Sequence, residues 1–135
     1  MKLHHVSLKT PQLEVLASFY RNVFFCKIVH IFHNNRGVYG FLLQFPEGGF
    51  IEILQSDVIE RTRDLNVDHF AVQVTSIFQF CESSRPFFPS DFPTPRRGRT
   101  DNVLSLSISD PDGNTVEIQQ LDEHVKYSPN LPARV

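Results

Sequence analysis

The chain has 135 residues, of which 41% are hydrophobic, and a formal net charge of −2 at pH 7. This length is typical of one domain and is enough to bury a core without disulfides or a structural metal. The slightly acidic balance argues against nucleic acid or an anionic membrane as the main partner. We expect no signal peptide and no membrane span, because no sufficiently long apolar stretch is present. The two cysteines, Cys26 and Cys81, lack metal-type spacing and indicate a reduced, cytoplasmic protein.

Hydrophobic periodicity predicts a strand, a helix and three further strands in the first part of the chain. Residues 3–9 form the first predicted strand. Thr10 and Pro11 then suit the N-cap and first position of a helix. One helical face is apolar (Leu13, Leu16, Ala17, Tyr20, Val23 and Phe24). The remaining strands are expected at three places (27–32, 38–45 and 50–55).

The same order returns later in the chain. We expect a strand at 67–74, a short helix at 76–83 and a hairpin at 103–120. Between them, residues 85–99 contain four prolines, which exclude a regular helix. The sequence therefore predicts a single domain over 1–135, made of two modules with a linker and a tail (modules 1–56 and 67–121, linker 57–66, tail 122–135).

One histidine and one glutamate recur at matching places in the two modules. His69 follows His5 by 64 residues, and Glu117 follows Glu52 by 65. A duplicated module that supplies one imidazole and one carboxylate can build a four-ligand metal site where the halves meet. Such a ligand set suits Zn, Fe, Ni, Co or Mn.

Strand alternation predicts which faces carry these residues, because successive side chains point to opposite sides. His5 shares a face with Ser7, which selects His5 rather than His4 as the ligand. Glu52 has apolar neighbours on its own face (Phe50 and Leu54). The alternative is that both polar faces simply meet water, as in many antiparallel sheets. That alternative leaves the recurrence of His and Glu in both halves unexplained.

The repeated strand–helix–strand–strand–strand order, with His on the first strand and Glu on the last, resembles the vicinal oxygen chelate superfamily. This group includes glyoxalase I, extradiol dioxygenases, fosfomycin-resistance transferases and bleomycin-resistance proteins. The resemblance covers residues 3–121 and is most specific in three segments (HVSL at 5–8, SFYRNV at 18–23 and DPDGNTVEI at 110–118). It implies an α+β fold in which two βαβββ modules form a curved mixed sheet around a metal-binding cavity.

Residue by residue, His5, Glu52, His69 and Glu117 match the two-His, two-Glu set of bacterial-type glyoxalase I. The resemblance thus implies one divalent metal ion (Ni, Co, Zn, Fe or Mn) and lyase or isomerase chemistry through an enediolate on a small oxygenated substrate. Glu52 and Glu117 are the candidate catalytic bases, with Glu52 in the drier surroundings and Glu117 as the firmer ligand. It also implies a homodimer, with modules paired within a chain or exchanged between chains.

Five further residues are candidates for binding the substrate, since they precede or lie on a strand of the polar face (Arg96, Arg97, Arg99, Ser105 and Ser107). A solvated basic loop is the alternative for the arginines. Two other functions stay open: a dioxygenase or thiol transferase that uses only His5, His69 and Glu117, and a non-catalytic binder of a small molecule. The chain departs from the superfamily in lacking a glycine after the first helix, where Phe24 and Phe25 stand, and no glutathione-binding set can be matched.

Overall fold

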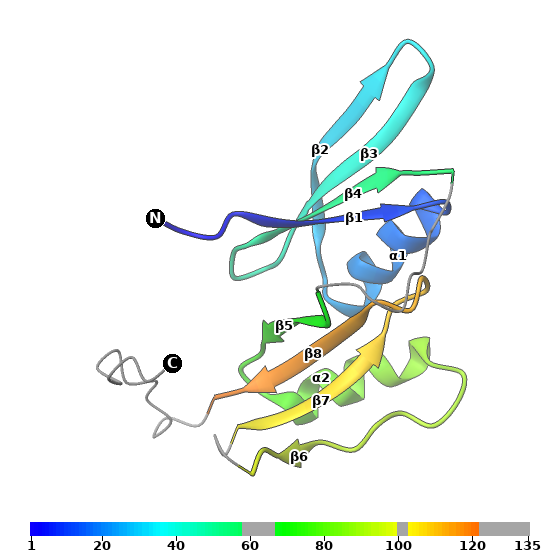
Figure 1. Ribbon diagram of the computed structural model, residues 1–135. Coiled ribbons are helices and arrows are strands. Elements are labelled where there is room, and N and C mark those ends of the chain that lie inside the picture. The colour runs from blue at the N-terminus through cyan, green and yellow to red at the C-terminus, as the bar shows by residue number, and fades with distance from the viewer. Residues whose placement is uncertain (58–66, 100–102, 122–135) are drawn as a thin grey trace.

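Two four-stranded mixed sheets, each accompanied by a helix, make up the protein in a computed structural model that describes residues 1–57, 67–99 and 103–121 (Figure 1). The α+β class and the two βαβββ modules are confirmed. The expected linker, apart from Asp57, and the expected tail lie outside the described residues. Within the described ranges, no helix has the length and apolarity that crossing a membrane requires.

The first module contains one helix and four strands in the predicted order. Its sheet runs β1-β4-β3-β2, with β1 parallel to β4 and the other neighbours antiparallel. The elements have the following bounds: β1 His5–Thr10, α1 Leu13–Val23, β2 Lys27–Asn34, β3 Gly37–Gln44 and β4 Phe50–Gln55.

The predicted start of the first helix is wrong by two residues. Gln12, not Thr10, is the N-cap of α1, and Pro11 precedes the helix. Thr10 instead stays in β1 as the register partner of Gln55 and is fully buried. Its hydroxyl accepts a hydrogen bond from the Gln12 backbone N–H at 3.1 Å. Sheet pairing therefore outweighs the local capping preference of Thr10.

The second module repeats the arrangement with shorter elements. Its sheet runs β5-β8-β7-β6, again with the first pair parallel. The segment with four prolines contains one 3-10 turn and a two-residue strand, β6, which periodicity did not predict. The bounds are β5 His69–Gln73, α2 Ile77–Ser84, η1 Arg85–Phe87, β6 Arg96–Arg97, β7 Leu104–Ser109 and β8 Thr115–Gln120.

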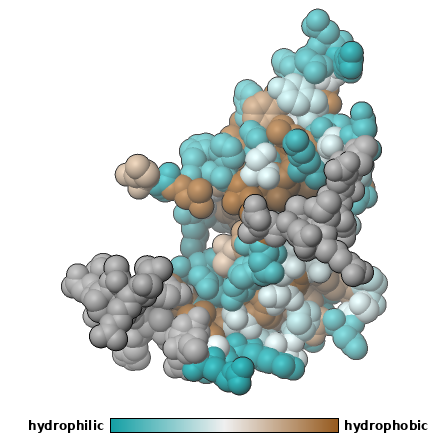
Figure 2. All heavy atoms as spheres, viewed as in Figure 1, coloured by the Kyte–Doolittle hydropathy of each residue, from teal (hydrophilic) through white to brown (hydrophobic). Residues whose placement is uncertain are grey.

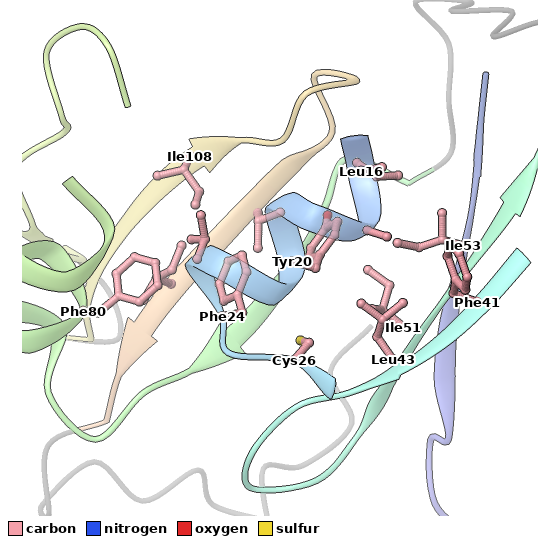
Figure 3. Close-up of a cluster of buried hydrophobic side chains, with 14 of the residues drawn as sticks. Leu16, Tyr20, Phe24, Cys26, Phe41, Leu43, Ile51, Ile53, Phe80 and Ile108 are labelled. Carbon is pink, nitrogen blue, oxygen red and sulfur yellow. The ribbon is translucent and has the colours of Figure 1, made fainter. Parts of the chain in front are cut away.

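One hydrophobic core joins the two modules around α1 (Figure 3). Leu16 and Tyr20 of α1 are fully buried. Strands of the first sheet contact the helix on one side, while α2 and the second sheet supply the opposite wall. Buried side chains from both sheets complete the core (Phe41, Leu43, Ile51, Ile53, Leu106, Ile108, Val116 and Ile118). Burial of this apolar surface is the main force that holds the modules together.

A buried polar contact also joins the modules, and it comes from the 110–113 turn. The Tyr20 hydroxyl donates a hydrogen bond to Asp110 Oδ2 at 2.8 Å. Gln12 Nε2 donates to Asp112 Oδ1 at 2.6 Å. Burial, and then the neighbouring Asp110 carboxylate, raise the pKa of Tyr20 far above its usual range, so this phenol remains a donor. The turn therefore docks the second module against α1.

Candidate metal centre

His69 and Glu117 lie on one face of the second sheet and touch each other. In the register of β5 and β8, Ala71 is the partner of Glu117, and His69 lies two residues earlier on the same face. The distance from His69 Nε2 to Glu117 Oε2 is 3.0 Å. Their side chains are 40% and 26% exposed, so both remain accessible to a ligand.

The residue before His69 fixes the orientation of its ring. His69 Nδ1 lies 2.7 Å from Asp68 Oδ2, which leaves Nε2 as the nitrogen aimed at Glu117. The pKa of His69 is raised by the bond to Asp68 first, against partial burial, with Glu117 adding a further upward effect. The predicted site omitted Asp68, although a carboxylate next to a candidate ligand was a usable signal. A carboxylate on the second nitrogen of a histidine is a common support for metal ligands.

The first sheet holds His5 and Glu52 in an equivalent arrangement with different neighbours. Ser7 is the register partner of Glu52, and its hydroxyl donates to Glu52 Oε1 at 2.8 Å. His5 lies two residues earlier on the same strand, and its Nδ1 is 2.9 Å from Nδ1 of His4. Each candidate ligand histidine is thus contacted through Nδ1 by the residue that precedes it.

The two modules therefore share one geometric relation, in which the glutamate is two positions beyond the strand partner of the histidine. The pairs nevertheless stand on separate sheets. Among residues 1–57, 67–99 and 103–121, no three His, Cys, Asp or Glu side chains gather closely enough to hold one metal ion. The structure brings together His69 with Glu117, and it does not bring all four candidate ligands together within one chain.

The donor chemistry of each pair fits a divalent transition metal, since imidazole and carboxylate are both ligands of such ions. Each pair supplies two donors, whereas protein sites for these metals use three or four. One chain thus presents two half-sites of matching chemistry.

A cleft of about 860 Å³ lies between the modules; of the four candidate ligands His5 lines it, whereas Glu52, His69 and Glu117 are not among its lining residues. His4, His5 and Phe50 line it from the first module, and β5 and α2 line it from the second. In Figure 2 the surface is hollowed between the upper and lower modules on the side of the N-terminus. β1 and β5 are the outer strands of their sheets, so each has one edge without a strand partner among the described residues.

Strand register places the candidate substrate-binding residues on different faces of the second sheet. Arg96 pairs with Ser105 and Arg97 with Leu104, so the two arginines point to opposite faces. Ser107 pairs with Glu117. The face that carries Glu117 therefore also carries Arg96, Ser105 and Ser107, whereas Arg97 shares the face of Leu104. Arg99 is exposed beyond the end of β6.

Both cysteines are buried and form no disulfide. Burial raises the pKa of the Cys26 thiol to about 12. Burial also raises the pKa of Cys81, against a smaller opposing effect from Arg85. A nucleophilic cysteine needs a lowered pKa, so cysteine catalysis is a poor fit to this structure.

Comparison with solved structures supports the fold. The chain is similar to a glyoxalase/bleomycin resistance protein/dioxygenase domain from Frankia sp. EAN1pec, with 17% identity, a TM-score of 0.75, and coverage of 92% of this chain and 94% of that one. It is similar to the fosfomycin resistance protein FosX from Listeria monocytogenes, with 19% identity, a TM-score of 0.68, and 91% and 95% coverage. TioX from Micromonospora sp. ML1 has 10% identity, a TM-score of 0.68, and 89% and 98% coverage.

These neighbours share the fold of this chain, in which two βαβββ modules are paired. The identities are low, so the likeness establishes the architecture only. No protein-family model matches the sequence, and no curated protein matches it either.

Proposed function

We propose that the protein is a metal-dependent enzyme of the glyoxalase I type, a lyase or isomerase that acts on a small oxygenated substrate. The observation that carries this proposal is a pair of histidine and glutamate on neighbouring strands, which recurs once on each sheet with the same register. In the second sheet, His69 Nε2 already lies 3.0 Å from Glu117 Oε2. We propose His5, Glu52, His69 and Glu117 as the ligands of one divalent ion, which is Ni, Co, Zn, Fe or Mn.

We propose further that the site forms between two copies of the chain. The half-sites of a single chain stand on separate sheets, which supports an exchange of modules in a homodimer. Within the described ranges, the outer edges of β1 and β5 have no strand partner, and such edges readily pair with another chain. A two-fold dimer would contain two equivalent sites, each with His5 and Glu52 from one chain and His69 and Glu117 from the other.

The proposed chemistry is proton transfer between neighbouring carbons. The metal, when bound, would hold two adjacent substrate oxygens and stabilise the negative charge that develops on them. Glu52 would act as general base, because Phe50 and Leu54 share its face and keep its surroundings drier. Glu117, aligned by His69, would be the firmer ligand.

The two buried, unpaired cysteines support a cytoplasmic location.

The first test is metal content after removal of bound ions and reloading with Ni, Zn, Fe(II) or Mn. We expect about one ion per chain in the wild-type protein and a loss of that ion in His69→Ala. Glu52→Gln should keep the ion and lose turnover, whereas Glu117→Gln should lower the affinity for metal. Absence of stoichiometric metal under every condition would leave a non-catalytic binding protein as the better assignment. Dependence of activity on O2 or on an added thiol would indicate the dioxygenase or transferase alternative.

A mixing experiment tests where the site forms. His5→Ala and His69→Ala chains each carry one damaged half-site. If modules pair across chains, a mixed dimer regains one intact site from the undamaged halves, so metal binding should reappear when the two variants are unfolded together and refolded. If modules pair within a chain, every site keeps one damaged half and nothing is regained. Separately refolded variants are the control.

A further inference from the structure

A continuous row of polar side chains crosses the second sheet beside Glu117. Gln73, Gln119 and Ser105 are register partners on β5, β8 and β7, and Arg96 extends the row onto β6. This row lies two residues along the strands from Glu117 and on the same face. The row therefore borders the His69–Glu117 pair and ends in a guanidinium group.

The equivalent row of the first sheet lacks polar side chains on three of its four strands. Lys9 on β1 begins this row, and Leu54, Gly40 and Phe32 continue it as register partners on β4, β3 and β2, beside Glu52. A Cβ at Gly40 would lie 2.7 Å from Leu54 Cδ2 and 3.2 Å from Phe32 Cδ2, so these two side chains close over the glycine. The result, beyond Lys9, is an apolar wall in the place where the second module has the amide of Gln119, the hydroxyl of Ser105 and the guanidinium of Arg96.

Arg96 is suited to bind a ligand because it lies on the same face as Glu117 and is exposed. It is exposed, and the ion pairs recorded within the described part of the chain both involve His69 rather than Arg96. Arg97 points to the opposite face and has interactions of its own. The strand of Arg96 is two strand spacings, roughly 10 Å, from the strand of Glu117. The planar fork of arginine matches a carboxylate or phosphonate group bidentately.

We propose that Arg96, supported by Ser105 and Gln119, is an anion subsite that selects substrates with a carboxylate or phosphonate group several ångströms from their metal-binding oxygens. In the exchanged dimer proposed above, the apolar wall of Leu54 and Phe32 from the other chain takes the non-polar part of the same molecule. This inference rests on the proposed function, since it names the substrate class of that site. Arg96 is a specificity-determining residue here, and it takes no part in holding the metal.

Two matched probes test the subsite in the metal-loaded protein. Benzohydroxamate chelates the metal through two oxygens, and 4-carboxybenzohydroxamate adds only a remote carboxylate. We expect the carboxylate to tighten binding about tenfold in the wild-type protein. That gain should disappear in Arg96→Gln and persist in Arg97→Gln, which removes the same charge from the opposite face. Both variants should bind metal and benzohydroxamate like the wild-type protein.

A second measurement separates failure of the subsite from failure of the proposed function. Phenylphosphonate is titrated into metal-free protein, and the amide signals of Ser105 and Gln119 are followed by NMR. We expect saturable shifts that Arg96→Gln abolishes, whether or not the protein binds metal. If benzohydroxamate never binds but these shifts occur, the metal proposal fails and the anion subsite stands. Persistence of the carboxylate gain in Arg96→Gln, or no shift with phenylphosphonate, would overturn the subsite.

Discussion

The two modules share a backbone plan but differ in the side chains around their ligand pairs. Both sheets place a glutamate two positions beyond the strand partner of a histidine. Next to Glu52 the first module has Leu54 and Phe32, whereas next to Glu117 the second has Gln119 and Arg96. The duplicated framework thus keeps the geometry of the candidate ligands, whereas the side chains beside them have diverged.

The modules also differ in how they contribute to stability. α1 has 11 residues and lies within the shared core, whereas α2 has 8 residues. Phe24, just after α1, packs against rings from both modules, and its ring centroid lies 5.5 Å from that of Phe80 in α2. The second module therefore depends on the first module's helix and on the residues that follow it. Substitutions at this joint should reveal that dependence.

The largest effect is expected from Phe24→Ala. Phe24 is 5% exposed, and its ring lies 5.7 Å from Tyr20 and 5.8 Å from Phe45, in addition to Phe80. Truncation would open a cavity shared by both modules and lower the free energy of unfolding by about 3–5 kcal/mol. Chemical denaturation measures the change, and Phe45→Ala at the partly buried rim of the cluster should cost less. A loss below about 1 kcal/mol would show that the modules are stable independently.

A smaller loss is expected from Tyr20→Phe, which removes only the hydroxyl that joins α1 to Asp110. The ring stays packed, but a buried carboxylate loses a hydrogen bond of 2.8 Å. We expect unfolding to become easier by about 1–3 kcal/mol. Tyr39→Phe, on an exposed residue of the β2–β3 hairpin, is the control and should change stability little. Equal effects of the two substitutions would contradict a polar joint between the modules.

Gly40→Ala tests the apolar wall of the first module. The new methyl group would meet Leu54 Cδ2 at 2.7 Å and the Ile53 carbonyl oxygen at 2.8 Å, and the second contact is with backbone that cannot easily move. We expect a cost of about 1–3 kcal/mol from this overpacking. Ser105→Ala, at the equivalent place in the second sheet, should change stability by less than about 0.5 kcal/mol. A thermal melt of each variant decides whether the two walls differ as the structure indicates.

Local sequence patterns were sufficient to predict the repeated elements apart from β6, and the faces of the longer strands. Alternation alone put His5 with Ser7 and selected it over His4, because the period of a strand is local. The start of α1 was mispredicted, since the burial of Thr10 depends on its pairing with a strand 45 residues away. The opposite directions of Arg96 and Arg97 follow from pairing with β7, which the sequence of a two-residue strand cannot indicate.

The sequence also did not predict that the two candidate ligand pairs lie apart in one chain, because this separation depends on contacts between distant segments. Periodicity predicts that His5 and His69 lie on polar faces, but it carries no information on how two sheets are placed relative to each other. That placement depends on tertiary contacts such as Tyr20 with Asp110 and Phe24 with Phe80. The roles of the ligands and of the substrate-binding residues accordingly stay predictions, to be tested by the metal and probe experiments.

The smallest effect, and one of opposite sign, is expected from Phe25→Gly. Phe25 has a φ of 56°, in the left-handed region that glycine adopts freely and that other residues enter at a cost of about 1–2 kcal/mol. The second module needs no such residue, because the chain leaves α2 through Arg85 at a φ of −48°. Glycine should raise the free energy of unfolding by about 0.5–1 kcal/mol, because relief of this strain outweighs the higher entropy that glycine gives the unfolded chain.

Phe25→Ala separates the two contributions to this effect, because it removes the ring and keeps the strained backbone. The Phe25 side chain is 59% exposed and lines the cleft between the modules, so its removal should cost little in a single chain. If Phe25→Gly is destabilising while Phe25→Ala is neutral, the left-handed conformation is not strained as its φ indicates. If both are destabilising, packing of the Phe25 ring in the cleft contributes more to stability than its exposure suggests. In that case the first module retains a bulky residue at this helix end for packing against its neighbour.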